Sequence, residues 1–218
     1  MTGGLSNTDL GNGLLDSYDG FAQMLRHLDT SAWTTPTRCA GWEVRDIAGH
    51  VVGLANDAAT GVPGSRTPDE QAAALRDFEP VDLAGQLGAT IASLRGLINV
   101  LDDAAWNGPS GVPDTTLAKG VHGLWWDTYA HADDIHAALG FGADRGPGLK
   151  ASVDYLAYQL TKRGWGPATL ALDGLPTIDI GAGGTKVTGD PYDFILVASG
   201  RADAATMGLD PTVNVYLA

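Results

Sequence analysis

A long apolar stripe at helical spacing runs through the middle of the chain. Its members recur every three or four positions: Leu83, Leu87, Ile91, Leu94, Ile98 and Leu101. This period places them on one face of an α-helix, so the spacing predicts a helix over 82–103 that packs against other helices. Similar stripes predict helices over 8–28, 43–59 and 116–139, and a capping pattern at 67–70 predicts a short helix to about 77. The first two thirds of the chain therefore favour a helical bundle.

The pattern of the sequence changes after residues 146–148, Gly-Pro-Gly. A predicted helix over 150–163 precedes short apolar or alternating runs at 168–172, 176–180 and 186–188, which predict strands. Asp190-Pro191 predicts the start of a helix that Gly200 ends, and 212–217 is predicted to be a final strand. The expected fold class is α+β, with a helical bundle over 1–145 and a small α+β domain over 146–218.

The composition limits where the protein is expected and which classes of partner it could bind. The 218 residues include one cysteine, Cys39, which excludes an intrachain disulfide framework, and the N-terminus lacks the pattern of a signal peptide. We therefore expect a cytoplasmic protein. The formal net charge of −13 disfavours nucleic acid and anionic lipid, and no apolar run approaches the roughly 20 residues that cross a bilayer. Neither nucleic acid nor a membrane is an expected partner.

Three residues of metal-ligand type fall on two of the predicted helices. Asp127 and His131 are four residues apart, so their side chains are neighbours on one helical face. His50 lies on the inner flank of the helix over 43–59. Two imidazoles and one carboxylate with an open fourth position make up a catalytic zinc site. The pattern predicts such a site in the bundle; the alternative for His131 is a core histidine held by a neighbouring carboxylate.

Asp134 faces the same side as His131 and could be a fourth ligand. We favour a role as the acceptor that orients a ligand histidine. His122 and His136 point to the opposite side of the helix and are predicted to lie on the surface. His27 has no partner visible in the sequence, so we assign it no chemistry.

Other candidate groups keep two interpretations each. Cys39 could be a nucleophile before a helix N-terminus or a small buried residue under Trp42. Arg201 could bind an anionic substrate bidentately or be a solvated arginine. The glycine-rich segment 181–189 matches no phosphate-binding motif and favours a hairpin, and no G-x-S-x-G pattern supports serine hydrolysis.

The segments 37–50 and 126–140 together resemble the mycothiol-dependent maleylpyruvate isomerase family of the DinB-like metal-binding superfamily. The first resembles the family element Cys-x-Gly-Trp-x-Val-x-Asp-x-x-x-His, and the second resembles its other metal element. The resemblance implies a DinB-like bundle with a metal triad of His50, Asp127 and His131. It also implies a substrate contact from Arg201 and mycothiol as a small-molecule thiol cofactor. Two positions differ: the characterised isomerase has glutamate at the place of Asp127, and Glu43 stands where serine or threonine commonly caps the helix.

The leading hypothesis is a metal-dependent thiol enzyme in which Zn²⁺ or another divalent ion lowers the pKa of a small-molecule thiol. Its partners would be that thiol and an electrophilic or anionic small molecule, in an S-transferase or a cis–trans isomerase reaction. Asp134 would orient a ligand, and Arg201 would hold an anionic group. The alternatives are a metal- or small-ligand-binding protein without chemistry, and a hydrolase that uses zinc-bound water.

Overall fold

The computed structural model describes residues 4–217, which form two compact units. The helical unit spans Leu5–Ala143, and the C-terminal unit starts at Asp144. Helices dominate, and the described strands form one small sheet, so the predicted α+β class is confirmed. The assignment of 1–145 and 146–218 as domains stays a prediction.

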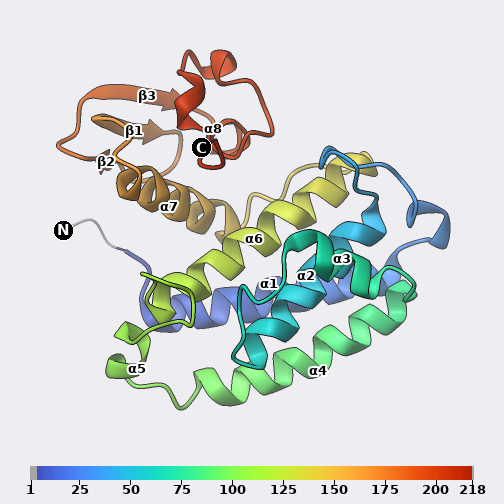
Figure 1. The fold of residues 1–218 in the computed structure, drawn as a ribbon. Helices are drawn as coiled ribbons and strands as arrows, with labels where there is room; N and C mark the ends of the chain where they lie inside the picture. Colours follow the sequence, from blue (N-terminus) through green and yellow to red (C-terminus); the bar gives the residue numbers. More distant parts are fainter. Residues whose placement is uncertain (1–3, 218) are drawn as a thin grey trace. The chain divides into compact units, whose positions relative to one another are not determined.

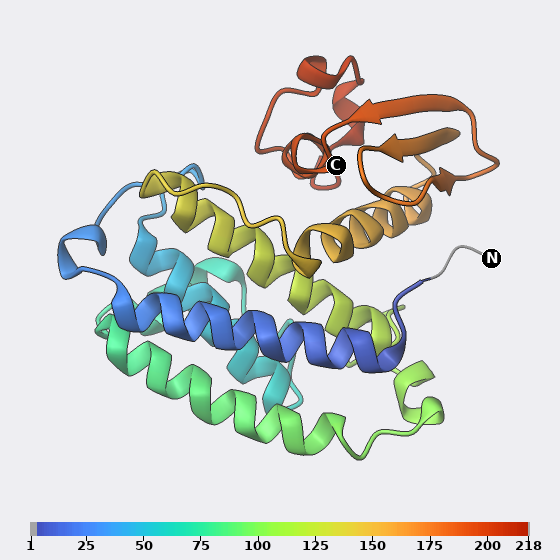
Figure 2. The same ribbon diagram turned by 180° about the vertical axis from the view of Figure 1, so that it is seen from behind.

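The helical unit contains six α-helices and one 3₁₀ turn among its described residues. They are α1 (Asn7–His27), η1 (Thr30–Ala32), α2 (Val44–Ala59), α3 (Pro68–Leu75), α4 (Pro80–Ile98), α5 (Asp103–Asn107) and α6 (Leu117–Ala138). Helix α1 packs against α4 and α6, and α2 packs against α3, α4 and α6, as both ribbon views show (Figures 1 and 2). The predicted stripes supply the core, because Leu14 and Tyr18 of α1 and Leu83 and Leu87 of α4 are almost fully buried.

The predicted long helix over 82–103 is shorter in the structure, and a separate helix follows it. Helix α4 ends at Ile98, and the Asp102 side chain accepts a hydrogen bond from the Ala105 amide at 2.8 Å. This N-cap starts α5, whose Trp106 is buried. Local capping therefore overrides the continuation of the stripe at Leu101.

Two glycines of α2 allow α3 to approach closely. A Cβ atom built on Gly49 would lie 2.9 Å from the backbone oxygen of Ala72, and one built on Gly53 would lie 2.9 Å from Cβ of Gln71. No larger residue fits at either position without a shift of α3. The close approach brings Gln71 of α3 against α2.

The C-terminal unit contains α7 (Pro147–Lys162), β1 (Ala168–Leu172), β2 (Ile178–Ile180), β3 (Thr185–Gly189), α8 (Pro191–Ala198), η2 (Ala204–Met207) and η3 (Pro211–Val213). The strand order is β2-β1-β3, with β1 antiparallel to β2 and parallel to β3. Ala168, Leu170 and Leu172 alternate inward along β1, and α7 packs against α8.

The predicted final strand over 212–217 is wrong. The Asp210 side chain accepts from the Thr212 amide at 2.9 Å, and the Pro211 carbonyl accepts from the Asn214 amide at 3.0 Å. These bonds form η3 and consume the amides that a strand would need. The Val215 amide donates to the Ala198 carbonyl, which ties this segment to the end of α8.

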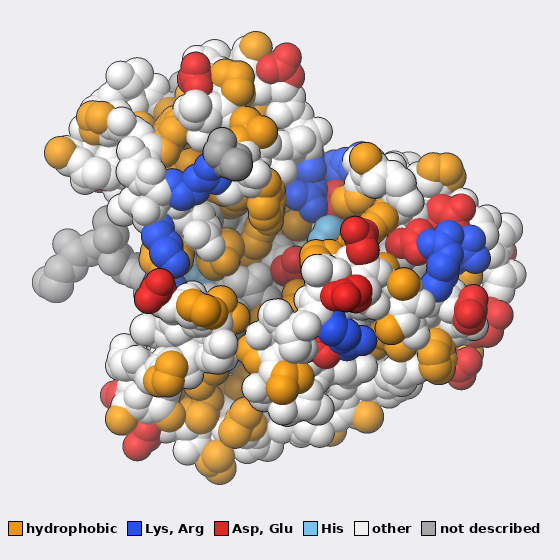
Figure 3. Space-filling model, in the orientation of Figure 1, with side chains coloured by type: hydrophobic (Ala, Val, Ile, Leu, Met, Phe, Trp, Pro, Cys, Tyr) orange, Lys and Arg blue, Asp and Glu red, His pale blue; other side chains and the backbone are white. Residues whose placement is uncertain are grey.

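No helix among residues 4–217 is both long and apolar enough to span a bilayer. On the face shown in Figure 3, acidic and basic side chains lie side by side over the helical unit. Two ion pairs of this unit tie α2 to the chain that follows it: Arg76 binds Asp46, and Arg66 binds Asp57 at 2.5 Å.

Candidate metal centre

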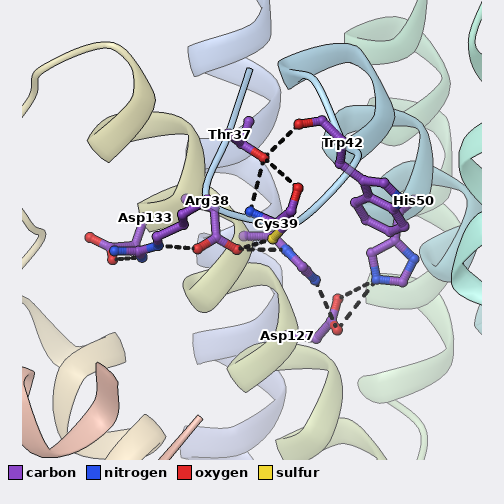
Figure 4. Close-up of polar contacts among 9 residues, drawn as sticks. Thr37, Arg38, Cys39, Trp42, His50, Asp127 and Asp133 are labelled. Atoms are coloured by element: carbon purple, nitrogen blue, oxygen red, sulfur yellow. Dashed lines mark hydrogen bonds and ion pairs between the residues drawn. The ribbon is translucent and has the colours of Figure 1, made fainter. Parts of the chain in front are cut away.

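Two helices bring the three predicted ligands together. His50 comes from α2, and Asp127 and His131 come from α6, with one ligand atom of each residue within 4.8 Å of the others. The Nε2 atom of His50 lies 3.4 Å from the Asp127 carboxylate, and Nε2 of His131 lies 3.7 Å from it. Figure 4 shows Asp127 directed at His50. Their role as ligands stays a prediction, because a cluster of this kind also occurs without an ion.

The outer nitrogens of both histidines contact hydrogen-bond acceptors. Nδ1 of His50 lies 2.8 Å from Oε1 of Gln71, and Nδ1 of His131 lies 2.9 Å from Oδ2 of Asp134. An acceptor at Nδ1 places the single proton of a neutral imidazole on that atom, so in the neutral form each Nε2 would present a lone pair to the centre. Two lone pairs and a carboxylate then face one another.

Such a set of converging acceptors needs a cation, either a shared proton or a divalent metal. Burial lowers the pKa of His50, but its hydrogen bond to Asp127 and the charge of that carboxylate outweigh burial and raise the pKa above its ordinary value. The site therefore attracts positive charge. Two imidazoles and a carboxylate, each imidazole backed by an acceptor, fit a divalent ion of the zinc type.

Asp134 connects the loop before α2 to α6. It is fully buried and accepts from Nε of Arg38 at 2.5 Å and from Sγ of Cys39 at 3.1 Å, besides facing His131. Arg38 also binds Asp133, as Figure 4 shows. The carboxylate of Asp134 is thus neutralised by a guanidinium, which favours an orienting acceptor over a fourth ligand. Cys39 is half-buried, and its thiol lies in this network.

Trp42 covers the two histidines. Its ring centroid lies 5.4 Å from that of His50 and 6.0 Å from that of His131. The indole Nε1 donates to Oδ1 of Asp69 at 2.9 Å, which fixes the ring over the site. An apolar cover of this kind limits the access of water to the cluster.

Several residues at the site were not predicted from the sequence. Gln71 is 1% exposed and its Nε2 donates to Oδ2 of Asp57 at 2.8 Å, while Asp57 binds Arg66. Arg38 was also missed. No local pattern marked them, because their partners lie 14 and 21 residues away in sequence for Gln71 and 95 and 96 residues away for Arg38.

The remaining predicted residues fall in different places. His122 is buried, so its predicted surface position is wrong: it shares a buried stripe of α6 with Trp125 and Tyr129, and α1 covers Trp125 through Gly13. His136 is half-buried and His27 is exposed. Arg201 is half-buried in the C-terminal unit, directly after the left-handed Gly200. The structure therefore groups Asp134 with the triad, whereas the contact expected of Arg201 stays a prediction.

The fold and the site together define a helical-bundle protein with a candidate metal centre, formed by two imidazoles and a carboxylate from two helices. A family model described as the mycothiol maleylpyruvate isomerase N-terminal domain matches residues 14–136. The chain belongs to this family. No curated protein sequence matches the chain significantly.

Two solved structures share the fold. A crystal structure of the mycothiol-dependent maleylpyruvate isomerase has a TM-score of 0.66 at 18% identity, over 91% of this chain and 90% of that chain. A histidine-to-alanine mutant of that isomerase has a TM-score of 0.62 at 17% identity, with the same coverage. At this identity the likeness defines the fold, and the chemistry depends on the residues described above.

Proposed function

We propose that this protein is a metal-dependent enzyme that uses a low-molecular-weight thiol, with mycothiol as the family suggests. The observation that carries the proposal is the convergence of His50, Asp127 and His131 with both outer imidazole nitrogens fixed by acceptors. A divalent ion held by these three residues would supply an open position at which the pKa of a thiol falls.

The protein's own groups position this chemistry. His50 and His131 would bind the ion through Nε2, Asp127 would supply the negative charge, and Asp134 would hold His131 in its ring orientation. Trp42 covers the histidines and limits hydration. Arg201 would contact an anionic group of the substrate.

Two reactions match this arrangement: transfer of the thiol to an electrophile, and its reversible addition to a conjugated double bond with cis–trans isomerisation. In both reactions His50, Asp127 and His131 would hold the ion at which the thiol is activated. The family description supports the isomerase reaction.

Metal content per chain tests the proposal first. Wild type, His131→Ala and the matched control His27→Ala, whose histidine is exposed and bonded to the Gln23 carbonyl, are purified without a histidine tag and measured by inductively coupled plasma mass spectrometry. We expect near-stoichiometric zinc in wild type and control and its loss in folded His131→Ala. Wild type that stays empty after incubation with Zn²⁺ contradicts the proposal.

A second measurement separates the reaction classes. Consumption of an electrophile that needs both metal and thiol supports the thiol enzyme. Ester or amide cleavage that needs metal and no thiol supports a hydrolase, and tight binding of a small molecule without turnover supports a binding protein.

A further inference from the structure

We infer that Arg66, Asp57 and Gln71 form a relay that sets the ring tautomer of His50, and that these residues act as positioning residues for the metal site. The inference rests on the metal site proposed above. It starts from an asymmetry: His131 is oriented by a carboxylate of its own helix, whereas His50 is oriented by a neutral amide from α3.

The first step of the relay is the fixed charge of Asp57. Arg66 donates to it through Nε at 3.1 Å and through Nη2 at 2.5 Å, and the Asp57 side chain is 8% exposed. Burial acts to raise the pKa of Asp57, but the hydrogen bonds from Arg66 and Gln71 lower it below its ordinary value. Asp57 is therefore ionised at neutral pH and can only accept hydrogen bonds.

The second step is the orientation of the Gln71 amide. A glutamine side chain could point either its oxygen or its nitrogen at His50. Because Asp57 only accepts, Gln71 directs Nε2 to Asp57 at 2.8 Å and Oε1 to His50. The orientation of the Gln71 amide is thus set by Asp57, which lies 14 residues away in sequence.

The third step follows at the ring of His50. Oε1 of Gln71 only accepts, so in the neutral ring Nδ1 carries the proton and Nε2 keeps a lone pair for a metal ion. With the opposite tautomer, an N–H group would occupy the ligand position. Gly53 supports the relay because its missing side chain lets Gln71 lie against α2.

The substitution Asp57→Asn makes the relay testable. Arg66 needs an acceptor and is bound mainly at Oδ1, so the new amide nitrogen replaces Oδ2 and faces Gln71. Two donors then oppose each other, and the Gln71 amide turns over to relieve the conflict. Its nitrogen then donates to Nδ1 of His50, which requires the proton to be on Nε2.

The readout is the His50 tautomer in metal-free, ¹⁵N-labelled protein, from long-range ¹H–¹⁵N correlation spectra at a pH at which the rings are neutral. We expect the Nδ1–H form in wild type and the Nε2–H form in Asp57→Asn. Zinc affinity, measured by competition with a chromophoric chelator, is expected to fall about 10–100-fold in Asp57→Asn. The matched control Asp19→Asn alters an exposed carboxylate paired with Arg95 in the same unit and should change neither readout.

Gln71→Met provides a second variant of similar shape, which decides the question even if Asp57→Asn does not fold. It removes the acceptor, so we expect both tautomers of His50 and a comparable loss of zinc affinity. A folded variant with the wild-type tautomer and an affinity within about twofold of wild type would overturn the relay. If wild type binds no zinc, the proposed function fails, and the tautomer spectra still decide the relay alone.

Discussion

The Nδ1 atom of His131 lies 2.9 Å from Oδ2 of Asp134, one helical turn further along α6. This contact fixes the ring of His131 with Nε2 toward Asp127. In Asp134→Asn the acceptor loses its charge and no longer balances Arg38, so we expect zinc affinity to fall about 10–100-fold. Chelator competition on the folded variant measures the change.

Asp133→Asn is the matched control for this substitution. Asp133 is adjacent in sequence, is buried and also binds Arg38, but the contact to His131 is made by Asp134. We expect the control to lose stability with little change in zinc affinity. Equal losses of affinity in both variants would show that Arg38 and the loop, not the contact to His131, determine binding.

The carboxylate of Asp127 supplies the negative charge of the triad. Asp127→Ala leaves two neutral imidazoles, so we expect zinc affinity to fall by more than about 100-fold, beyond the usual effect of an orienting residue. Asp127→Glu keeps the charge and lengthens the side chain by one methylene, and we expect it to retain near-stoichiometric zinc. Titration of metal-free protein with Zn²⁺ measures both, and a glutamate variant as weak as the alanine variant would contradict the prediction.

We expect substitution of glycine by alanine to have opposite effects on stability at two positions of α1. A Cβ atom at Gly13 would lie 2.2 Å from the Trp125 ring, whereas one at Gly20 meets no atom within 4 Å. We expect Gly13→Ala to lower the free energy of unfolding by about 1–3 kcal/mol through overpacking. Gly20→Ala should raise it by roughly 0.5–1 kcal/mol, because alanine loses less conformational freedom in a helix. Urea unfolding followed by circular dichroism measures both, and changes of the same sign would contradict this description of the α1–α6 contact.

We expect the stability of the C-terminal unit to depend on pH through Asp190. Hydrogen bonds from both terminal nitrogens of Arg145, at 3.0 and 2.8 Å, hold its pKa below the ordinary value, outweighing burial, and the Tyr192 amide lowers it further. Between the folded and unfolded pKa values the unfolded chain binds more protons, so the stabilisation is complete above the ordinary aspartate pKa of about 3.9 and is lost as the pH falls through the folded pKa.

Hydrogen exchange of the α8 amides between about pH 5 and pH 2 tests this dependence. Asp190→Asn should flatten the loss of protection at low pH. Asp193→Asn in the same turn is the control that keeps the pair with Arg145. An unchanged pH profile in Asp190→Asn would show that other carboxylates dominate the acid response of this unit.

Elements that are determined by residues close together in the sequence could be predicted. Helical periodicity located α1, α2 and α6, because apolar residues at steps of three and four must share one face. The i,i+4 spacing of Asp127 and His131 likewise follows from helix geometry alone. The final strand was wrong because Asp210 forms a side-chain turn that competes with strand pairing.

The network around the triad could not be predicted in this way. His50 meets Gln71 only because α3 packs on α2, and Arg38 reaches Asp134 across 96 positions of sequence. Such contacts depend on tertiary packing, which no local pattern encodes. The burial of His122 has the same origin, because a helix packed on more than one side has no single solvent face.

Gly53 allows α3 to pack closely enough on α2 for Gln71 to reach His50. Helix α3 supplies none of the three candidate ligands, yet its distance from α2 determines whether Gln71 reaches His50. A bulkier residue at this position would push Gln71 away from His50 without replacing any candidate ligand. The spacing of two helices thus decides whether the imidazole of His50 keeps its partner on α3.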